Sequence, residues 1–277
     1  MARPDSTGKP EEQVPIPEPL TSPAVDSHCH LDLLTVPVAE ALEASRSAGV
    51  PRVVTVGVDV ASSRWSAAAA AEYDGVVAAV AIHPNEAAES ADFDADMAAI
   101  IELAALPQVR AIGETGLDYY RTGTEGRPAQ EVSFRRHIAL AKASGKALVI
   151  HDRDAHDDVL RVLDEEGDPG TVVMHCFSGG ADFARRCIER GFVLSFAGNI
   201  TFKSAGLLRE AVAVTPLDQL LVETDAPFLT PVPFRGRHNA PHLIPLTLRA
   251  ISEQRGVPID ELAQQVTATA TRVFGDW

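Results

Sequence analysis

Short apolar stretches alternate with longer, alanine-rich stretches along the chain after about residue 24. The short stretches are rich in valine, isoleucine and leucine and are apolar over most of their length, which is typical of strands buried on both faces of a parallel sheet. This pattern predicts strands at residues 24–28, 52–56, 76–82, 109–114, 147–151, 171–175, 192–196 and 219–224.

The stretches between the predicted strands have the spacing of apolar residues that is typical of helices. They predict helices over residues 38–49, 62–73, 92–106, 130–145, 156–167, 180–191 and 204–213, followed by a C-terminal helical region. Gly49, Gly145 and Gly191 follow helical stretches, where glycine commonly ends a helix. The chain therefore consists of repeated strand–helix units.

Eight strand–helix units in about 250 residues predict an α/β protein with a single-domain (β/α)8 TIM barrel. An open, doubly wound sheet could use the same elements. Polar residues at the predicted strand ends favour the barrel, because only a closed barrel brings the ends of its first and eighth strands together with the others, at the C-terminal face where such enzymes have their active sites. These strand-end residues are His28, His30, Glu114, His151, His175 and Asp225.

The first 23 residues are rich in proline and polar residues. We expect them to form a flexible N-terminal extension, followed by a hydrolase-like barrel over residues 24–277. The extension lacks the apolar segment of a secretory signal, and no apolar run reaches the roughly 18 residues of a membrane span. The three cysteines show no CxxC spacing, which fits a reduced, cytoplasmic protein.

The formal net charge of −15 argues against broad, sequence-independent binding of nucleic acid. It is compatible with an enzyme that binds only a few phosphates. Nothing in the composition indicates a required protein partner or a membrane partner.

The first predicted strand ends in a pair of histidines that are separated by one residue. Strand alternation places His28 and His30 on one face, about 7 Å apart along the strand, so that both can bind one ion. The same alternation turns Cys29 away and puts Asp26 on the histidine face, where it could orient a ligand. Taken alone, this pair is equally well explained as a chance pair in a turn.

Glu114 closes an apolar strand, where a carboxylate is costly unless it is paired or binds a metal. A carboxylate in that position could bridge two cations. The alternative is a helix cap or a salt-bridged loop residue. For Asp118, four residues later, a supporting role in the loop is favoured over ligation.

Two single histidines repeat the pattern at the ends of adjacent predicted strands. A lone histidine at a strand end is usually a hydrogen-bonded core residue, but His151 and His175 occupy equivalent places, and both would point toward the barrel axis. Asp225 follows the last strand, where it could bind a metal and take a proton from the attacking water. Glu223 lies on the same face and either orients a ligand or forms a structural pair.

Together these residues supply imidazole and carboxylate ligands without a thiolate. This mixture suits hydrolytic sites for two divalent metal ions, Mg²⁺, Mn²⁺ or Zn²⁺, that activate a water between them. The predicted ligands are His28, His30, Glu114, His151, His175 and Asp225.

Several longer motifs occur in a fixed order along nearly the whole chain after residue 24. They are DSHCHLD, GETGLDYYR, FRRHIALA, HDRDA, MHCFSG and LVETDAPFLTPVPFRGRHNAP. In this order and spacing the chain resembles the TatD family of metal-dependent deoxyribonucleases, which are amidohydrolase-type TIM barrels. The resemblance implies that Glu114 bridges the ions and that Asp225 is the terminal ligand and the base. It also implies that His28 and His30 bind the first ion and His151 and His175 the second.

The resemblance further implies that His83 lies near the substrate, although a hydrogen-bonded loop histidine explains it equally well. Lys203, Arg235 and Arg237 follow the seventh and eighth predicted strands, a region of TIM barrels that often binds phosphate. Either they bind substrate phosphates or they are merely solvated.

Arg153 follows His151 and would line the mouth of the barrel, so we include it among the substrate-binding residues. Tyr119, Tyr120 and Phe177 could stack on unpaired bases. Aromatic packing at the mouth of the barrel explains these three equally well.

The sequence therefore predicts a deoxyribonuclease that hydrolyses phosphodiester bonds of DNA, with Asp225 and Glu114 as its catalytic residues. The resemblance implies 3′-to-5′ removal of nucleotides from single-stranded or frayed ends, in DNA repair or degradation. An ester or amide hydrolase on the same scaffold, such as a D-aminoacyl-tRNA deacylase, is the first alternative. A catalytically idle partner-binding barrel is the second, and the complete ligand set argues against it.

Overall fold

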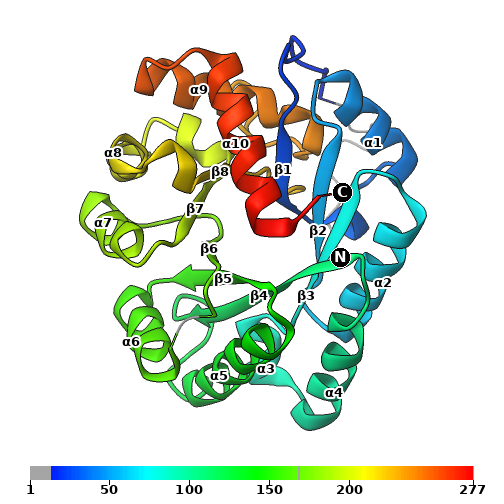
Figure 1. The fold of residues 1–277 in the computed structure, drawn as a ribbon, viewed down its shortest axis with the longest axis vertical. Coiled ribbons are helices and arrows are strands. Elements are labelled where there is room, and N and C mark those ends of the chain that lie inside the picture. The colour runs from blue at the N-terminus through cyan, green and yellow to red at the C-terminus, as the bar shows by residue number, and fades with distance from the viewer. Residues whose placement is uncertain (1–13, 168, 277) are drawn as a thin grey trace.

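The structure, a computed structural model, describes residues 14–167 and 169–276. Its strands form one parallel sheet in which each strand pairs with the next along the chain (Figure 1). The strands are β1 (Val25–Cys29), β2 (Arg52–Val56), β3 (Val76–Val80), β4 (Val109–Asp118), β5 (Ala147–Arg153), β6 (Val172–Met174), β7 (Val193–Phe196) and β8 (Leu220–Val222).

Helices surround the strands on the outside of the sheet (Figure 1). They are α1 (Val38–Ser47), α2 (Val60–Glu72), α3 (Pro84–Glu89), α4 (Phe93–Ala104), α5 (Arg127–Ser144), α6 (His156–Glu166), α7 (Ala181–Glu189), α8 (Gly206–Val214), α9 (Ile244–Arg255) and α10 (Ile259–Phe274). Short 3₁₀ helices lie in the loops: η1 (Leu31–Leu33), η2 (Gly198–Thr201), η3 (Leu217–Gln219) and η4 (Pro241–Leu243). None of the described helices is long and apolar enough to cross a membrane.

The sheet closes between its first and last strands, which confirms the predicted (β/α)8 barrel. The backbone N–H of His30 donates to the carbonyl of Ala226 at 2.8 Å, and that of Asp225 donates to the carbonyl of His28 at 2.9 Å. The closure therefore sets a ligand of the first strand directly beside Asp225.

A buried carboxylate reinforces this closure from the side-chain layer. Asp26 accepts hydrogen bonds from the backbone N–H of Thr224 at 2.9 Å and from its hydroxyl. Burial raises the pKa of Asp26 to about 8, although the hydrogen bonds from Thr224 act in the opposite direction. Asp26 thus orients the backbone at the strand closure rather than the histidine rings, for which the sequence suggested it.

The strands are buried on both faces, as their continuous apolar sequences predict. Every residue of β3 is buried, because the barrel interior covers one face and the surrounding helices cover the other. Gly116 shows how closely β4 and β5 approach, since a Cβ atom there would lie 2.1 Å from the carbonyl oxygen of His151. Only glycine fits at this point beside the site.

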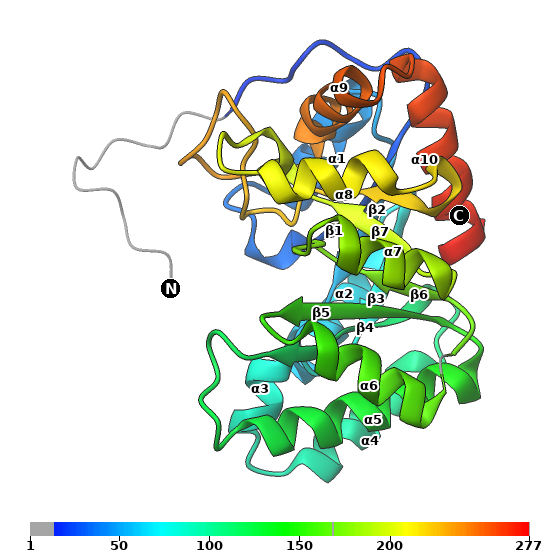
Figure 2. The same cartoon turned by 90° about the vertical axis from the view of Figure 1, so that its left-hand side faces the viewer.

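The described part of the expected extension, residues 14–23, packs against the barrel, whereas residues 1–13 lie outside the described residues. Val14 and Leu20 are buried, and the carbonyl of Val14 is 3.1 Å from Nε2 of His242. The N–H of Ser22 donates to Asp260 in α10 at 3.0 Å. The segment runs past α9 and α10 (Figure 2). Residues 14–23, which were expected to be mobile, lie against the barrel because apolar side chains among the prolines are buried there.

Candidate metal centre

The six predicted ligands meet at the end of the barrel where the strands terminate, which we call the barrel mouth. One or two come from each of five strands or the turns that follow them. They are His28 in β1, His30 after it, Glu114 in β4, His151 in β5, His175 after β6 and Asp225 after β8. His28, His30, Glu114 and His175 are buried, and the other two are partly buried. We call these six residues the ligand cluster.

Glu114 lies at the centre of the ligand cluster, and two of the predicted ligand histidines lie near each of its carboxylate oxygens. Oε2 lies 3.4 Å from Nε2 of His28 and 3.9 Å from Nε2 of His30. Oε1 lies 2.7 Å from Nδ1 of His151 and 3.4 Å from Nε2 of His175. The two oxygens therefore divide the histidines into two halves, an arrangement suited to a carboxylate that bridges two ions.

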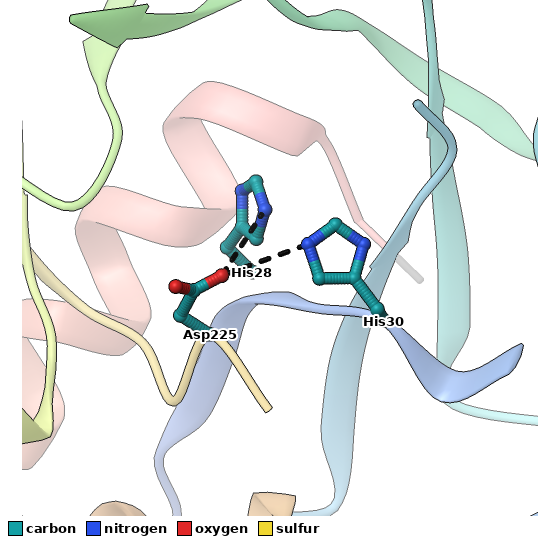
Figure 3. Close-up of side chains that lie close together, drawn as sticks. All are labelled: His28, His30 and Asp225. Atoms are coloured by element: carbon teal, nitrogen blue, oxygen red, sulfur yellow. Dashed lines mark ion pairs between the residues drawn. The ribbon is translucent and has the colours of Figure 1, made fainter. Parts of the chain in front are cut away.

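Asp225 completes the first half of the ligand cluster. Its Oδ1 lies 3.6 Å from Nε2 of His30 and 4.0 Å from Nε2 of His28, and Figure 3 shows the three side chains converging. The same oxygen is 4.0 Å from Nε2 of His175. One potential ligand atom from each of His28, His30 and Asp225 lies within 4.8 Å of the others, a separation that a single cation can span.

The missing hydrogen bonds of His28 indicate that this centre is suited to a cation. Both ring nitrogens of His28 are buried without a hydrogen-bond partner in the described residues. A buried imidazole left in this state costs free energy, which a cation at Nε2 would recover. The donor set of nitrogen and carboxylate oxygen suits Zn²⁺ or Mn²⁺ and admits Mg²⁺. The residues present therefore fit divalent ions.

Backbone and carboxylate partners orient the histidines from behind. Nδ1 of His175 lies 2.9 Å from Oε1 of Glu223, a buried carboxylate that also accepts the N–H of Cys176 at 2.9 Å. Nδ1 of His30 lies 3.0 Å from the carbonyl of Val56. Both contacts leave Nε2 facing the centre, as partners of metal-binding histidines commonly do.

Two neighbours of the predicted ligands lie where the sequence suggested. The thiol of Cys29 points away from the centre and lies 3.6 Å from the carbonyl of Val54, as strand alternation predicted. Asp118 supports His151, because its Oδ2 is 3.2 Å from Nε2 of that ring while its Oδ1 accepts the N–H of Tyr120 at 2.9 Å. Burial raises the pKa of Asp118, but the contact with His151 and other hydrogen bonds outweigh it and lower the pKa overall.

Carboxylates at the centre raise the pKa values of two of the histidines, His151 and His175, so that these rings tend to keep their protons in the metal-free protein. Burial lowers the pKa of His151, but the hydrogen bonds to Asp118 and Glu114 outweigh it and raise the pKa to about 9. The pKa of His175 is raised too, because Glu223 and Glu114 outweigh its burial. A cation that binds here must displace these protons, so binding should strengthen as the pH rises toward 9.

His83 forms a loop hydrogen bond and also lies beside the ligand cluster. It caps α3 by accepting the N–H of Asn85 at Nδ1, 3.1 Å away, which points Nε2 at Oε1 of Glu114, 3.6 Å away. Its ring lies 4.5 Å from that of His151. Burial lowers the pKa of His83 to about 3. The neutral ring therefore faces the second half of the cluster.

The predicted basic residues fall into two places. Arg153 lies at the barrel mouth, with its guanidinium 3.9 Å above the ring of Tyr120. Lys203, Arg235 and Arg237 are exposed, and no described contact joins any of them to the ligand cluster. Arg235 lies 4.4 Å above the ring of Phe202, beside Lys203, so these two cations share one edge of the barrel mouth.

Phe228 is a residue at the centre that the sequence interpretation missed. Its ring lies 6.2 Å from that of His30, in an edge-on arrangement, and 52 % of the residue is exposed. The position of Phe228, three residues after Asp225, was the available signal. An aromatic side chain exposed beside a cluster of ligands is a candidate substrate contact.

Comparisons with known proteins show which family this chain belongs to. The family model described as TatD related DNase matches residues 25–275. The metal-dependent hydrolase TatD of Mycobacterium tuberculosis is 46% identical over 260 residues, covering 91% of this chain and 97% of the relative. The 3′-5′ ssDNA/RNA exonuclease TatD of Citrobacter rodentium is 34% identical over 244 residues, covering 85% of this chain and 91% of the relative. The crystal structure of the TatD homologue YJJV of Escherichia coli superposes with a TM-score of 0.83 at 29% identity. The match covers 92% of this chain and 98% of that structure.

Proposed function

Since this chain belongs to the family of TatD-related DNases and is a metal-dependent hydrolase, we propose that it is a deoxyribonuclease that removes nucleotides from single-stranded or frayed DNA ends. The observation that carries the proposal is Glu114, whose two oxygens each face two of the predicted ligand histidines, with His83 also beside Oε1. Such a carboxylate suits a two-ion site, which is the common device for phosphodiester hydrolysis. The exonuclease name of the Citrobacter rodentium relative supports 3′-to-5′ polarity.

The residues divide the work as follows. His28, His30 and Asp225 would hold one divalent ion, and His151 and His175 the other, with Glu114 between them. When bound, the ions supply positive charge that binds the scissile phosphate and stabilises the negative charge developing on it.

Asp225 also has the properties of a general base. Burial raises its pKa, but His30, His175 and His28 outweigh burial and lower the pKa overall, so the carboxylate is ionised and can accept a proton from the attacking water. Its Oδ1 lies near Nε2 of His28 and of His30, so that it would help to hold one ion while accepting the proton.

The net negative charge of the protein favours a substrate that is contacted over only a few nucleotides. With a net charge of −15, the protein repels long duplex DNA except where local cations compensate. Arg153 at the barrel mouth and the edge formed by Lys203, Arg235 and Arg237 offer such cations. We assign them to phosphates of the nucleotides near the cleaved bond.

End-labelled single-stranded DNA tests the proposal directly. With Mg²⁺ or Mn²⁺ the wild-type protein should shorten a 5′-labelled strand by single nucleotides, whereas Glu114→Ala and Asp225→Ala should each lose at least about 100-fold in rate. The exposed Glu210→Ala serves as a matched control and should keep the wild-type rate. Turnover of aminoacyl esters without any turnover of DNA or RNA would overturn the proposal, and equal rates in all variants would reveal a contaminating nuclease.

A further inference from the structure

Large apolar side chains are exposed at a few places in the described chain, and only two of them are aromatic. These two are Tyr120, which is 66% exposed, and Phe228, which is 52% exposed. Both lie in loops that follow strands at the barrel mouth, Tyr120 after β4 and Phe228 after β8. Exposed aromatic rings in two loops beside the ligand cluster favour a ligand with aromatic groups on which they can stack.

Each ring stands next to a different half of the ligand cluster. Phe228 is beside His30, at 6.2 Å between ring centres, and belongs to the half that contains Asp225. Tyr120 follows Asp118, whose carboxylate is 3.2 Å from Nε2 of His151 in the other half. A group bound across both halves would therefore lie near both of the loops that carry these rings.

Hydrogen bonds hold the backbone of the two loops that carry these rings. The N–H of Phe228 donates to the carbonyl of Asp225 at 2.8 Å, and its own carbonyl accepts the side-chain amide of Asn239 at 2.6 Å. The N–H of Tyr120 donates to Oδ1 of Asp118 at 2.9 Å. These hydrogen bonds fix the backbone of both loops beside the ligand cluster, which lowers the entropic cost of stacking.

The charge beside Tyr120 favours a polyanion with aromatic bases over an apolar peptide. The guanidinium of Arg153 lies 3.9 Å above the Tyr120 ring, so cation and ring share one contact surface. Guanidinium groups bind phosphate oxygens, and aromatic rings stack on bases irrespective of sequence. Single-stranded nucleic acid presents both features at each nucleotide.

We propose that Phe228 and Tyr120 are stacking platforms for the bases of the two nucleotides that flank the scissile phosphate. The inference rests on the proposed nuclease function, because it places that phosphate at the ligand cluster. It goes further by assigning the substrate's bases to two named rings and by requiring that the flanking nucleotides be unpaired, since a base within a duplex cannot offer its face to a side chain.

The test compares a single-stranded oligonucleotide with the same strand in which the two nucleotides at the cleaved end lack their bases. On the normal strand, Phe228→Ala and Tyr120→Ala should each lower kcat/KM by about tenfold, chiefly through KM, whereas Phe228→Trp and Tyr120→Phe should keep it. On the abasic strand, both alanine variants should match the wild type. Val132→Ala, an equally exposed apolar residue in α5, should match it on both strands.

A spectroscopic readout separates stacking from general damage to the site. In Phe228→Trp the added indole should be quenched when the normal strand binds, and not when the abasic strand binds. Alanine variants that lose the same factor on both strands, or no quenching with the normal strand, would overturn the stacking inference while leaving the nuclease intact. A wild-type protein that cleaves neither strand would instead overturn the nuclease proposal and this inference with it.

Discussion

Glu223 offers a sharp test of how the site is built, because it touches a predicted ligand without facing the ions. The residue is fully buried, and its Oε1 lies 2.9 Å from Nδ1 of His175 and accepts the N–H of Cys176 at 2.9 Å. In Glu223→Gln the amide oxygen can still accept the N–H of Cys176. The negative charge that strengthens His175 as a ligand is lost.

The size of the effect follows from this geometry. Removing a carboxylate behind a metal-binding histidine typically lowers metal affinity by about 10- to 100-fold, which is about 1.4–2.8 kcal/mol. We expect the Mn²⁺ affinity of Glu223→Gln to fall within that range. The loss should concern one of the two binding steps, because we assign His175 to only one of the ions.

Calorimetric titration of the metal-free protein with Mn²⁺ measures both steps. Glu223→Asp, which keeps the charge, should fall between the wild type and Glu223→Gln, and the exposed Glu210→Gln should bind like the wild type. Thermal unfolding of each metal-free variant shows whether the fold survives. Unchanged affinity for both ions in a folded Glu223→Gln protein would refute the role assigned to this carboxylate.

Three further predictions concern the scaffold around the site. Burial lowers the pKa of His137 to about 4, while its Nε2 accepts the N–H of Ile82. Since the unfolded chain takes up this proton near pH 6.5, stability should fall by up to about 3 kcal/mol from pH 6.5 to pH 4, and urea unfolding of His137→Gln should show a shallower decline. Lys146 donates to the carbonyls of Ala104, Leu106 and Val109, so Lys146→Met should lower the urea-derived unfolding free energy by about 2 kcal/mol; no change would mean that water replaces the ammonium. Gly116→Ala should separate β4 from His151 and lower both melting temperature and Mn²⁺ affinity, and wild-type values for both would contradict the close approach.

Most of the architecture follows from apolar periodicity, because strands buried on both faces carry an unbroken apolar sequence. All eight strand predictions coincide with observed strands to within a few residues. The largest difference is β4, which was expected to end at Glu114 and continues to Asp118. Gly113 and Gly116 resemble a turn in sequence, but β4 pairs with β5 again after a register shift between Ile112 and Thr115 and continues to Asp118, opposite Arg153.

The candidate site was predictable where chemistry coincides with strand ends. His151 and His175 became conspicuous only because each closes an apolar strand, and the barrel places such ends together. The side of the ring that faces inward was not predictable, since it depends on contacts such as that between His175 and Glu223, which are distant in sequence. The exposure of Phe228 was not predictable from the sequence, because it depends on the conformation of the loop after β8.

Residues 14–23 show a different limit. Proline and polar residues dominate this segment, so composition alone predicts mobility. Two apolar side chains, Val14 and Leu20, are buried against the barrel, and the N–H of Leu20 donates to the carbonyl of Ala48 at 3.0 Å. Composition averages over a segment, whereas docking depends on a few contacts that the average conceals.

The central claim is that Glu114 bridges two divalent ions. The most direct measurement is the Mn²⁺ content of protein dialysed to equilibrium against saturating Mn²⁺, determined by elemental analysis of protein and dialysate alongside protein concentration. We expect two ions per chain for the wild type and for Glu210→Ala, and a loss of both in Glu114→Ala, because the bridging carboxylate would serve each ion. Two ions retained in Glu114→Ala, or no more than one in the wild type under saturating Mn²⁺, would contradict it.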